Sequence, residues 1–304
     1  MKYDLVTILG PTASGKTAIA TNLAHLLGAE IISADSRQVF RGMDLGTGKD
    51  LQEYVIDNSA VPFHLIDILE PGMEYNVHHF QEDFFNVFSQ IKSKGKPTVM
   101  CGGTGLYIES VLSGYQLITV PDDQVFRNNC SGKSMEELVE MLLKYKIPHA
   151  TSDLTKRDRL IRAIEIEKFK AENPQLLKIF PKFSSIVFGV KYERSVEKQR
   201  ITQRLISRIN DGMIDEVEKL INNGVSTEIL KSYGLEYKFV TRFLLGEIPK
   251  NQMFEELNIA IHQFAKRQMT WFRRMEKNGI TINWVDGDKS LDDKINTIKK
   301  IINK

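Results

Sequence analysis

The first hundred or so residues alternate between two spacings of apolar side chains. Short apolar runs rich in β-branched residues predict buried strands, and they lie at 3–9, 29–33, 63–69 and 97–101. The segments 16–27 and 77–93 instead repeat apolar residues at helical spacing. Strands that alternate with helices predict right-handed βαβ units, and therefore a parallel sheet with helices on its faces.

The pattern changes after about residue 115. The polar stretch 121–134 predicts a loop, and 134–173 has mainly helical spacing. Later breaks in a long helical pattern fall near Gly212, Gly224, Gly234 and Pro249. We predict five segments: an α/β core at 1–115, a small helical insertion at 116–183, a returning core strand at 184–192, a helical region at 193–278, and a C-terminal strand and helix at 279–304.

The composition narrows the class of protein. Of 304 residues, 42% are hydrophobic and 26% are charged, so most of the chain can bury a core and is not disordered. With 20 glycines, 9 prolines and 2 cysteines, collagen-like and disulfide-scaffold classes are excluded. The few cysteines favour a reducing compartment, and no apolar run reaches membrane-spanning length. The sequence therefore predicts a cytoplasmic protein without a membrane partner.

The net charge of +2 conceals an uneven distribution. Residues 1–150 hold 12 Lys and Arg against 18 Asp and Glu, and residues 151–304 hold 29 against 21, so the balances are −6 and +8. A basic second half suits a polyanionic partner. A solvated helical surface with spare lysines explains the same charge equally well.

The strongest chemical signal is the octapeptide from Gly10 to Thr17, GPTASGKT, which fits G-x-x-x-x-G-K-[ST] between a predicted strand and a predicted helix. Gly15 allows backbone amides to turn toward phosphate oxygens, and the helix that begins near Lys16 adds its N-terminal dipole. Lys16 adds a positive charge, and the Thr17 hydroxyl can ligate Mg²⁺. A nucleoside triphosphate and a bare diphosphate offer this loop similar oxygens. We predict a P-loop NTPase-like core and leave the ligand open.

Two further polar segments follow predicted strands. Asp35 comes after the strand at 29–33, and Thr104 follows Gly102 and Gly103 at the end of the next strand. In an open parallel sheet, ligands bind beyond the carboxyl ends of the strands, so both segments are predicted to face the same crevice as the loop. A carboxylate there can hold Mg²⁺ through water or accept a proton from a nucleophile. The alternative role for Asp35 is a helix cap.

Three basic helical stretches lie in the second half, at 156–162, 198–208 and 265–274. Arginine suits bidentate contacts with phosphate, and the aromatic residues within 265–274 can stack on unpaired bases. For any one stretch, a solvated basic face is the usual explanation. Three of them together favour an anionic partner.

The order of these motifs resembles one known family, the tRNA dimethylallyltransferases, also called tRNA isopentenyltransferases. The similar segments span nearly the whole chain: GPTASGKT (10–17), ISADSRQVFRGMDLGTGK (32–49), GGTGLY (102–107), DRLIRAIE (158–165), the helix from 200, and AKRQMTWFRR (265–274). Family members transfer a dimethylallyl group from its diphosphate to the exocyclic amine of an adenosine beside the anticodon. The resemblance implies tRNA and dimethylallyl diphosphate as partners, Mg²⁺ as cofactor, an inserted or appended helical tRNA-binding region, and a monomeric enzyme.

The resemblance also implies roles for individual residues. Lys16, Asp35 and Thr104 would serve catalysis, with Asp35 as the base, and Thr17 would hold the metal. The residues expected around the diphosphate are Gly10, Thr12, Ala13, Ser14, Gly15, Lys16, Thr17, and Arg200 or Arg204. The residues expected to contact tRNA are Asp35, Ser36, Arg37, Gln38, Thr104, Arg127, Asp158, Arg159, Arg162, Lys266 and Arg267.

Three other classes of protein remain as alternatives. A P-loop kinase for small molecules would bind ATP in the loop and would not need the basic second half. An adenylate isopentenyltransferase would keep the loop and Asp35 but lack the long RNA-binding helices. A non-enzymatic RNA-binding module would leave the phosphate-binding loop without a role.

Overall fold

The computed structural model describes residues 2–145 and 156–303. Within it the chain forms two compact units. One consists of Met1–Gly114 together with Lys182–Lys304, and the other of Tyr115–Pro181.

The larger unit is built on a six-stranded sheet whose neighbouring strands are all parallel. Across the sheet the order is β5 (Phe63–His64), β2 (Glu30–Ser33), β6 (Thr98–Gly102), β1 (Leu5–Leu9), β7 (Ser185–Lys191) and β8 (Ile282–Asp286). Leu5 of β1 lies beside Thr98 of β6 and Ser185 of β7, so β1 is a central strand. The predicted α/β class with a P-loop-like parallel core is confirmed.

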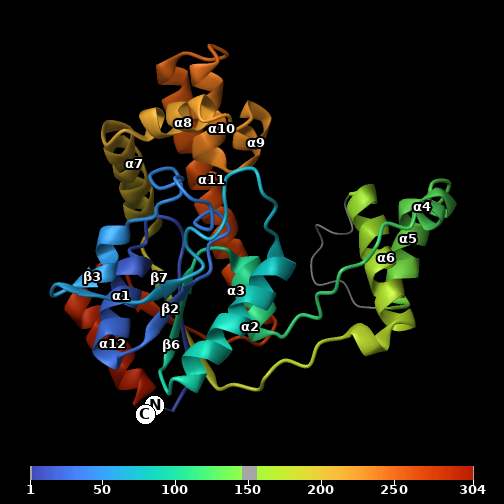
Figure 1. Ribbon diagram of the computed structural model, residues 1–304, viewed down its shortest axis with the longest axis horizontal. Coiled ribbons are helices and arrows are strands. Elements are labelled where there is room, and N and C mark those ends of the chain that lie inside the picture. Colours follow the sequence, from blue (N-terminus) through green and yellow to red (C-terminus); the bar gives the residue numbers. More distant parts are fainter. Residues whose placement is uncertain (1, 146–155, 304) are drawn as a thin grey trace. The chain divides into compact units, whose positions relative to one another are not determined.

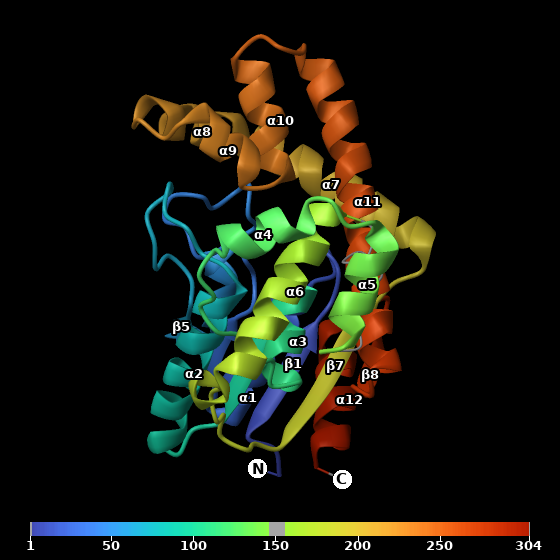
Figure 2. The same cartoon turned by 90° about the vertical axis from the view of Figure 1, so that its right-hand side faces the viewer.

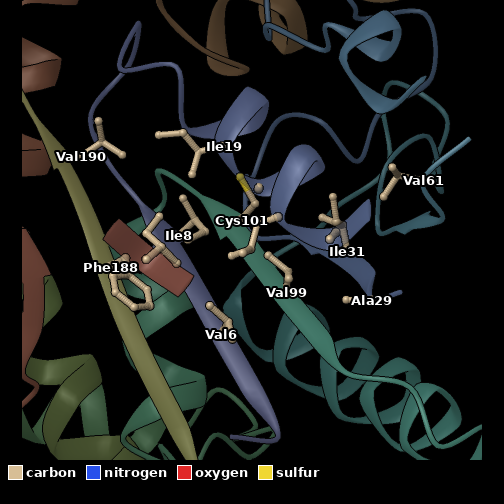
Figure 3. Close-up of a cluster of buried hydrophobic side chains, with 14 of the residues drawn as sticks. Val6, Ile8, Ile19, Ala29, Ile31, Val61, Val99, Cys101, Phe188 and Val190 are labelled. Atoms are coloured by element: carbon tan, nitrogen blue, oxygen red, sulfur yellow. The ribbon is translucent and has the colours of Figure 1, made fainter. Parts of the chain in front are cut away.

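Helices cover both faces of this sheet (Figure 1). α1 (Lys16–Leu27) and α12 (Leu291–Ile302) pack on one face, and α2 (Val77–Ser93) and α3 (Gly105–Leu112) on the other. Between the sheet and α1, Ile8, Cys101 and Phe188 of the strands meet Ile19 of the helix (Figure 3). All four side chains are buried, which anchors the start of α1 at the carboxyl ends of the strands.

After β7 the chain is almost entirely helical up to β8. The helices are α7 (Arg194–Asn210), α8 (Met213–Asn222), α9 (Thr227–Ser232), α10 (Leu235–Leu244) and α11 (Lys250–Lys277). The predicted breaks are confirmed, and Gly212, Gly224 and Gly234 have φ of 103°, 88° and 149°, which side chains with a Cβ rarely adopt. α11 packs against α10, as Figure 2 shows, and also against α7. It also packs against α3, so it connects the helical region to the helices that cover the sheet.

The smaller unit contains α4 (Gln124–Cys130), α5 (Met135–Leu143) and α6 (Arg157–Glu172). Its own core includes the buried Cys130, Leu138, Leu160 and Ile164. A capping box starts α5, where the Ser134 hydroxyl accepts from the Glu137 amide and the Glu137 carboxylate accepts from the Ser134 amide.

Two local predictions are wrong. The run at 63–69 forms a strand only at Phe63–His64, because Leu65 and Asp67 take φ of 62° and 54° and end the extended backbone. The stretch 121–134 is not all loop, because Asp123 caps the short helix α4 by accepting a hydrogen bond from the Phe126 amide at 2.8 Å. Residues 146–155 of the predicted helical stretch 134–173 lie outside the described residues.

Candidate active site

The loop between β1 and α1 has the backbone geometry of an anion-binding nest. Ala13 and Gly15 have φ of 61° and 73°, in the left-handed region, and Gly15 leads directly into the first turn of α1. A Cβ on Gly10 would lie 2.6 Å from Ser14 Oγ and 3.2 Å from the Val190 carbonyl oxygen, so only glycine fits there. Ser14 is 2% exposed, and its hydroxyl has no hydrogen-bond partner among the described residues. The loop is therefore a polar cradle fixed by its own packing.

A cavity of about 890 Å³ opens above this loop. It brings together almost all the predicted site residues of the larger unit: Thr12, Ala13, Ser14, Gly15, Lys16, Thr17, Asp35, Ser36, Arg37, Gln38, Thr104, Arg200, Arg204 and Arg267. Gly10 lies behind the loop, against Val190. Lys266 does not line this cavity but a separate hollow beside Pro11.

The Asp35 segment is held at the carboxyl end of β2 by hydrogen bonds to its neighbours. Asp35 Oδ1 accepts from the Arg37 amide at 3.0 Å, and no helix begins here, so the alternative of a helix cap is wrong. The Ser36 amide donates to Thr104 Oγ1 at 3.1 Å, which links this segment to the end of β6. Gln38 Nε2 donates to the Gly48 carbonyl at 3.1 Å. Carboxylate, hydroxyl and amide groups thus face one side of the cavity.

Arginines of α7 line the opposite side of the cavity. Arg200 Nε donates to the Ala13 carbonyl at 3.0 Å, and its guanidinium lies 4.6 Å from the centre of the Tyr192 ring. Arg204 Nη1 lies 3.4 Å from Thr12 Oγ1. The sequence left a choice between Arg200 and Arg204, and the structure places both against the loop. Burial, followed by the charge of Arg208, lowers the pKa of Arg204, so an anion in the cavity would favour its charged form.

Sequence reasoning missed Gln268, which joins two walls of the cavity. This side chain of α11 is 8% exposed; its Oε1 accepts from the Thr12 amide at 2.9 Å, and its Nε2 donates to the Gly103 carbonyl at 2.8 Å. It fixes the phosphate loop relative to the end of β6. Its neighbours in AKRQMTWFRR are charged or aromatic, and nothing in the local sequence distinguishes this glutamine from them.

Sequence reasoning also missed a contact that holds the loop at 43–49. Glu216 Oε2 accepts from the amides of Asp44 and Leu45 at 2.9 and 2.6 Å, and Oε1 accepts from the Gly46 amide at 3.0 Å and the Tyr237 hydroxyl at 2.6 Å. A Cβ on Gly46 would lie 2.6 Å from the Tyr237 ring. We call this contact the Glu216 latch. It fastens the cavity-lining loop to α8 and α10.

The remaining predicted tRNA contacts, Arg127, Asp158, Arg159 and Arg162, lie in the smaller unit. Arg127 Nη2 donates to Glu165 at 3.0 Å, and Arg162 pairs with the same carboxylate. Burial raises the pKa of Glu165, but the hydrogen bonds from these arginines outweigh it and lower the value to about 2. Asp158 and Arg159 are exposed on α6. The two arginines therefore have a structural role within this unit, and their contact with tRNA stays a prediction.

Comparison with known proteins identifies the protein family. The family model described as IPP transferase matches residues 38–275, and the model described as isopentenyl transferase matches residues 3–61. The chain belongs to the IPP transferase family. This membership confirms the resemblance read from the motifs.

Members of the IPP transferase family similar to this chain include tRNA dimethylallyltransferase 2 of Bacteroides fragilis, 51% identical over 298 residues that cover 98% of this chain and 97% of the relative. tRNA dimethylallyltransferase 1 of Parabacteroides distasonis is 49% identical over 302 residues, or 99% and 98% of the two chains. Among solved structures, the tRNA isopentenylpyrophosphate transferase of Bacillus halodurans is 32% identical with a TM-score of 0.73, covering 99% of this chain and 96% of that one.

None of the helices described in the structure has the length and apolar character that would let it cross a bilayer.

Proposed function

We propose that this protein transfers a dimethylallyl group from dimethylallyl diphosphate to the exocyclic amine of an adenosine next to the anticodon of tRNA and releases diphosphate. One observation carries the proposal: a single cavity is lined both by the phosphate-cradling loop and by the Asp35–Gln38 segment. Relatives about 50% identical over nearly the whole chain are named tRNA dimethylallyltransferases, which supports the same reaction.

The loop side of the cavity suits the diphosphate. As the carbon–oxygen bond of an allylic donor lengthens, negative charge develops on the leaving diphosphate, and fixed positive groups stabilise it. Lys16, Arg200 and Arg204 would supply that charge. Burial lowers the pKa of the Lys16 ammonium, so a diphosphate beside it would restore the preference for the charged form.

Magnesium fits the donors on this side of the cavity. Thr17 lines it, and Mg²⁺ takes a hydroxyl oxygen while keeping waters and substrate phosphate oxygens as its other ligands. Among the described residues, no group of three or more His, Cys, Asp or Glu side chains could hold a metal. Thr17 would hold Mg²⁺ together with the diphosphate, and the bound ion would neutralise charge on the leaving group.

The Asp35 side suits the adenine. The carbon of the dimethylallyl group forms a bond to the exocyclic nitrogen, its bond to the diphosphate oxygen breaks, and the amine proton moves to Asp35. Oδ1 of Asp35 accepts a hydrogen bond from the Arg37 amide, which holds the carboxylate in place, and Oδ2 would take the proton. The base must leave its stack to reach the cavity, where Ser36, Gln38 and Thr104 would orient it.

The proposal includes further tRNA contacts and the state of the enzyme. We expect a monomer in the cytoplasm, where tRNA is available. The side chains expected to contact tRNA are Arg37, Arg127, Asp158, Arg159, Arg162, Lys266 and Arg267.

Labelled dimethylallyl diphosphate tests the function. The protein is incubated with Mg²⁺ and the labelled donor, together with tRNA, tRNA lacking an adenosine next to the anticodon, or AMP. We expect label in the first RNA alone. Label in AMP would make the protein an adenylate isopentenyltransferase, and phosphate transfer from ATP without any prenyl transfer would make it a kinase.

A further inference from the structure

A second hollow, of about 290 Å³, adjoins the phosphate loop at Pro11. Its walls come from the loop, the end of β7, the start of α7, and one face of α11: Pro11, Lys191, Tyr192, Arg194, Glu197, Lys266, Met269 and Arg273. We call it the Lys266 hollow. Pro11 lines this hollow and Thr12 lines the cavity, so adjacent loop residues separate the two spaces.

The spacing along α11 assigns its residues to the two spaces. Lys266, Met269 and Arg273 are three and four residues apart, which places them on one face of the helix, toward the hollow. Arg267 and Gln268 face the cavity. One helix therefore lines both spaces.

The charge of the hollow is unbalanced. Four cationic side chains surround it against one carboxylate, and Arg194 lies 3.7 Å from that carboxylate, Glu197. Within the residues that the structure describes, Lys191, Lys266 and Arg273 have no carboxylate within 4.0 Å. Three like charges around one concave space repel one another, and an anion in that space offsets the repulsion.

The surroundings of Tyr192 indicate whether the hollow suits a phosphate group or a nucleobase as its ligand. The Tyr192 ring is already faced by the Arg200 guanidinium at 4.6 Å and by the Lys294 ammonium at 5.6 Å. It is therefore not a free surface for base stacking. The hollow offers positive charge from exposed, flexible side chains, which suits a phosphate group.

We propose that the Lys266 hollow binds a backbone phosphate of the tRNA strand close to the adenosine that enters the cavity. This inference rests on the proposed function, because it needs tRNA as the substrate. Lys191, Lys266 and Arg273 are the contacting side chains, and the phosphate would orient the strand without reading its sequence. A diphosphate donor passing the hollow has the same chemistry, so the experiment must separate the two sources.

The test uses the double variant Lys266→Gln with Arg273→Gln, and Lys191→Gln as a second variant from a different element. The matched control is Lys250→Gln with Lys277→Gln, because these exposed lysines lie on the same helix and line neither space. The affinity for tRNA is measured over a series of salt concentrations, and the affinity for dimethylallyl diphosphate is measured without tRNA.

We expect the double variant to weaken tRNA binding about tenfold at moderate salt. The slope of log affinity against log salt should also become shallower by about 1, because one phosphate contact is lost. Lys191→Gln should shift both in the same direction, and donor affinity should stay at the wild-type value. An unchanged slope would overturn the inference, and so would weaker donor binding with normal tRNA binding. Failure of the wild-type protein to prenylate tRNA would refute the proposed function instead.

Discussion

Replacing Glu216 by glutamine should loosen the loop at 43–49 from the helical region. The carboxylate accepts four hydrogen bonds, three from consecutive loop amides and one from the Tyr237 hydroxyl. Tyr237 is 1% exposed, so water cannot replace its partner. Glutamine keeps a single acceptor oxygen and presents an NH₂ group to two of the four donors.

The loss of stability can be estimated from the two donors that lose their acceptor. Each buried donor without an acceptor costs about 1–3 kcal/mol, so the two donors in Glu216→Gln should lower the free energy of unfolding by about 2–6 kcal/mol. For a unit of this size Tm falls by about 2–4 °C per kcal/mol, so that change lowers Tm by roughly 4–24 °C. Tyr237→Phe removes one of the four bonds and should cost only about 1 kcal/mol.

The latch should also affect the reaction, because the loop it holds lines the cavity and Gly48 of that loop accepts a hydrogen bond from Gln38. We expect Glu216→Gln to raise the KM for tRNA and lower kcat. Donor affinity should be unchanged, since Glu216 makes no hydrogen bond to residues 10–17.

Urea unfolding measures the stability, and steady-state prenyl transfer measures the kinetic constants. The matched control is Glu218→Gln, an exposed glutamate on the same helix. A Glu216→Gln protein that unfolds within about 0.5 kcal/mol of this control would refute the argument, because surface substitutions usually stay within that range. A change in donor affinity alone would refute the functional part.

Three further predictions concern single residues. Lys16→Ala should nearly abolish prenyl transfer while tRNA affinity in a binding assay stays near wild type, and comparable turnover would remove the loop from the donor site. Asp35→Asn should slow single-turnover transfer about 100- to 10,000-fold with both substrates still bound, and a rate restored by added Mg²⁺ would instead show that Asp35 mainly holds the metal. Burial raises the pKa of Glu30, but hydrogen bonds from Lys96 and His64 outweigh it and lower the value to about 2. Because the folded pKa lies below the unfolded value, this stabilisation is present above about pH 4.5 and is lost as the pH falls toward 2. Glu30→Gln should therefore flatten the pH dependence of stability in that range, and an unchanged acid-unfolding profile would contradict the assignment.

Features that depend on neighbours along the chain were predictable from the sequence. The helices predicted at 16–27 and 77–93 have those bounds in the structure. Helical spacing is a local property of the sequence, and the residues that show it, such as Phe80 and Phe84, are buried. The phosphate loop was equally predictable, since its glycines and the strand and helix on either side are consecutive in the chain. The failure at 63–69 came from backbone conformation, because Leu65 and Asp67 adopt positive φ despite an apolar pattern typical of a strand.

The completed cavity was decided by tertiary structure. Gln268 reaches the Thr12 amide across 256 residues of sequence, and Glu216 reaches the loop at 43–49 across about 170. The sequence could not decide between Arg200 and Arg204. In the structure α7 lies beside the phosphate loop, and both arginines contact it. The amino-acid sequence alone determined which groups could bind phosphate and accept a proton, because those capacities belong to the residues themselves. Which side chains line the cavity depends on how α7, α8 and α11 pack against the loops at the ends of the strands. No local sequence pattern encodes a hydrogen bond between such distant residues.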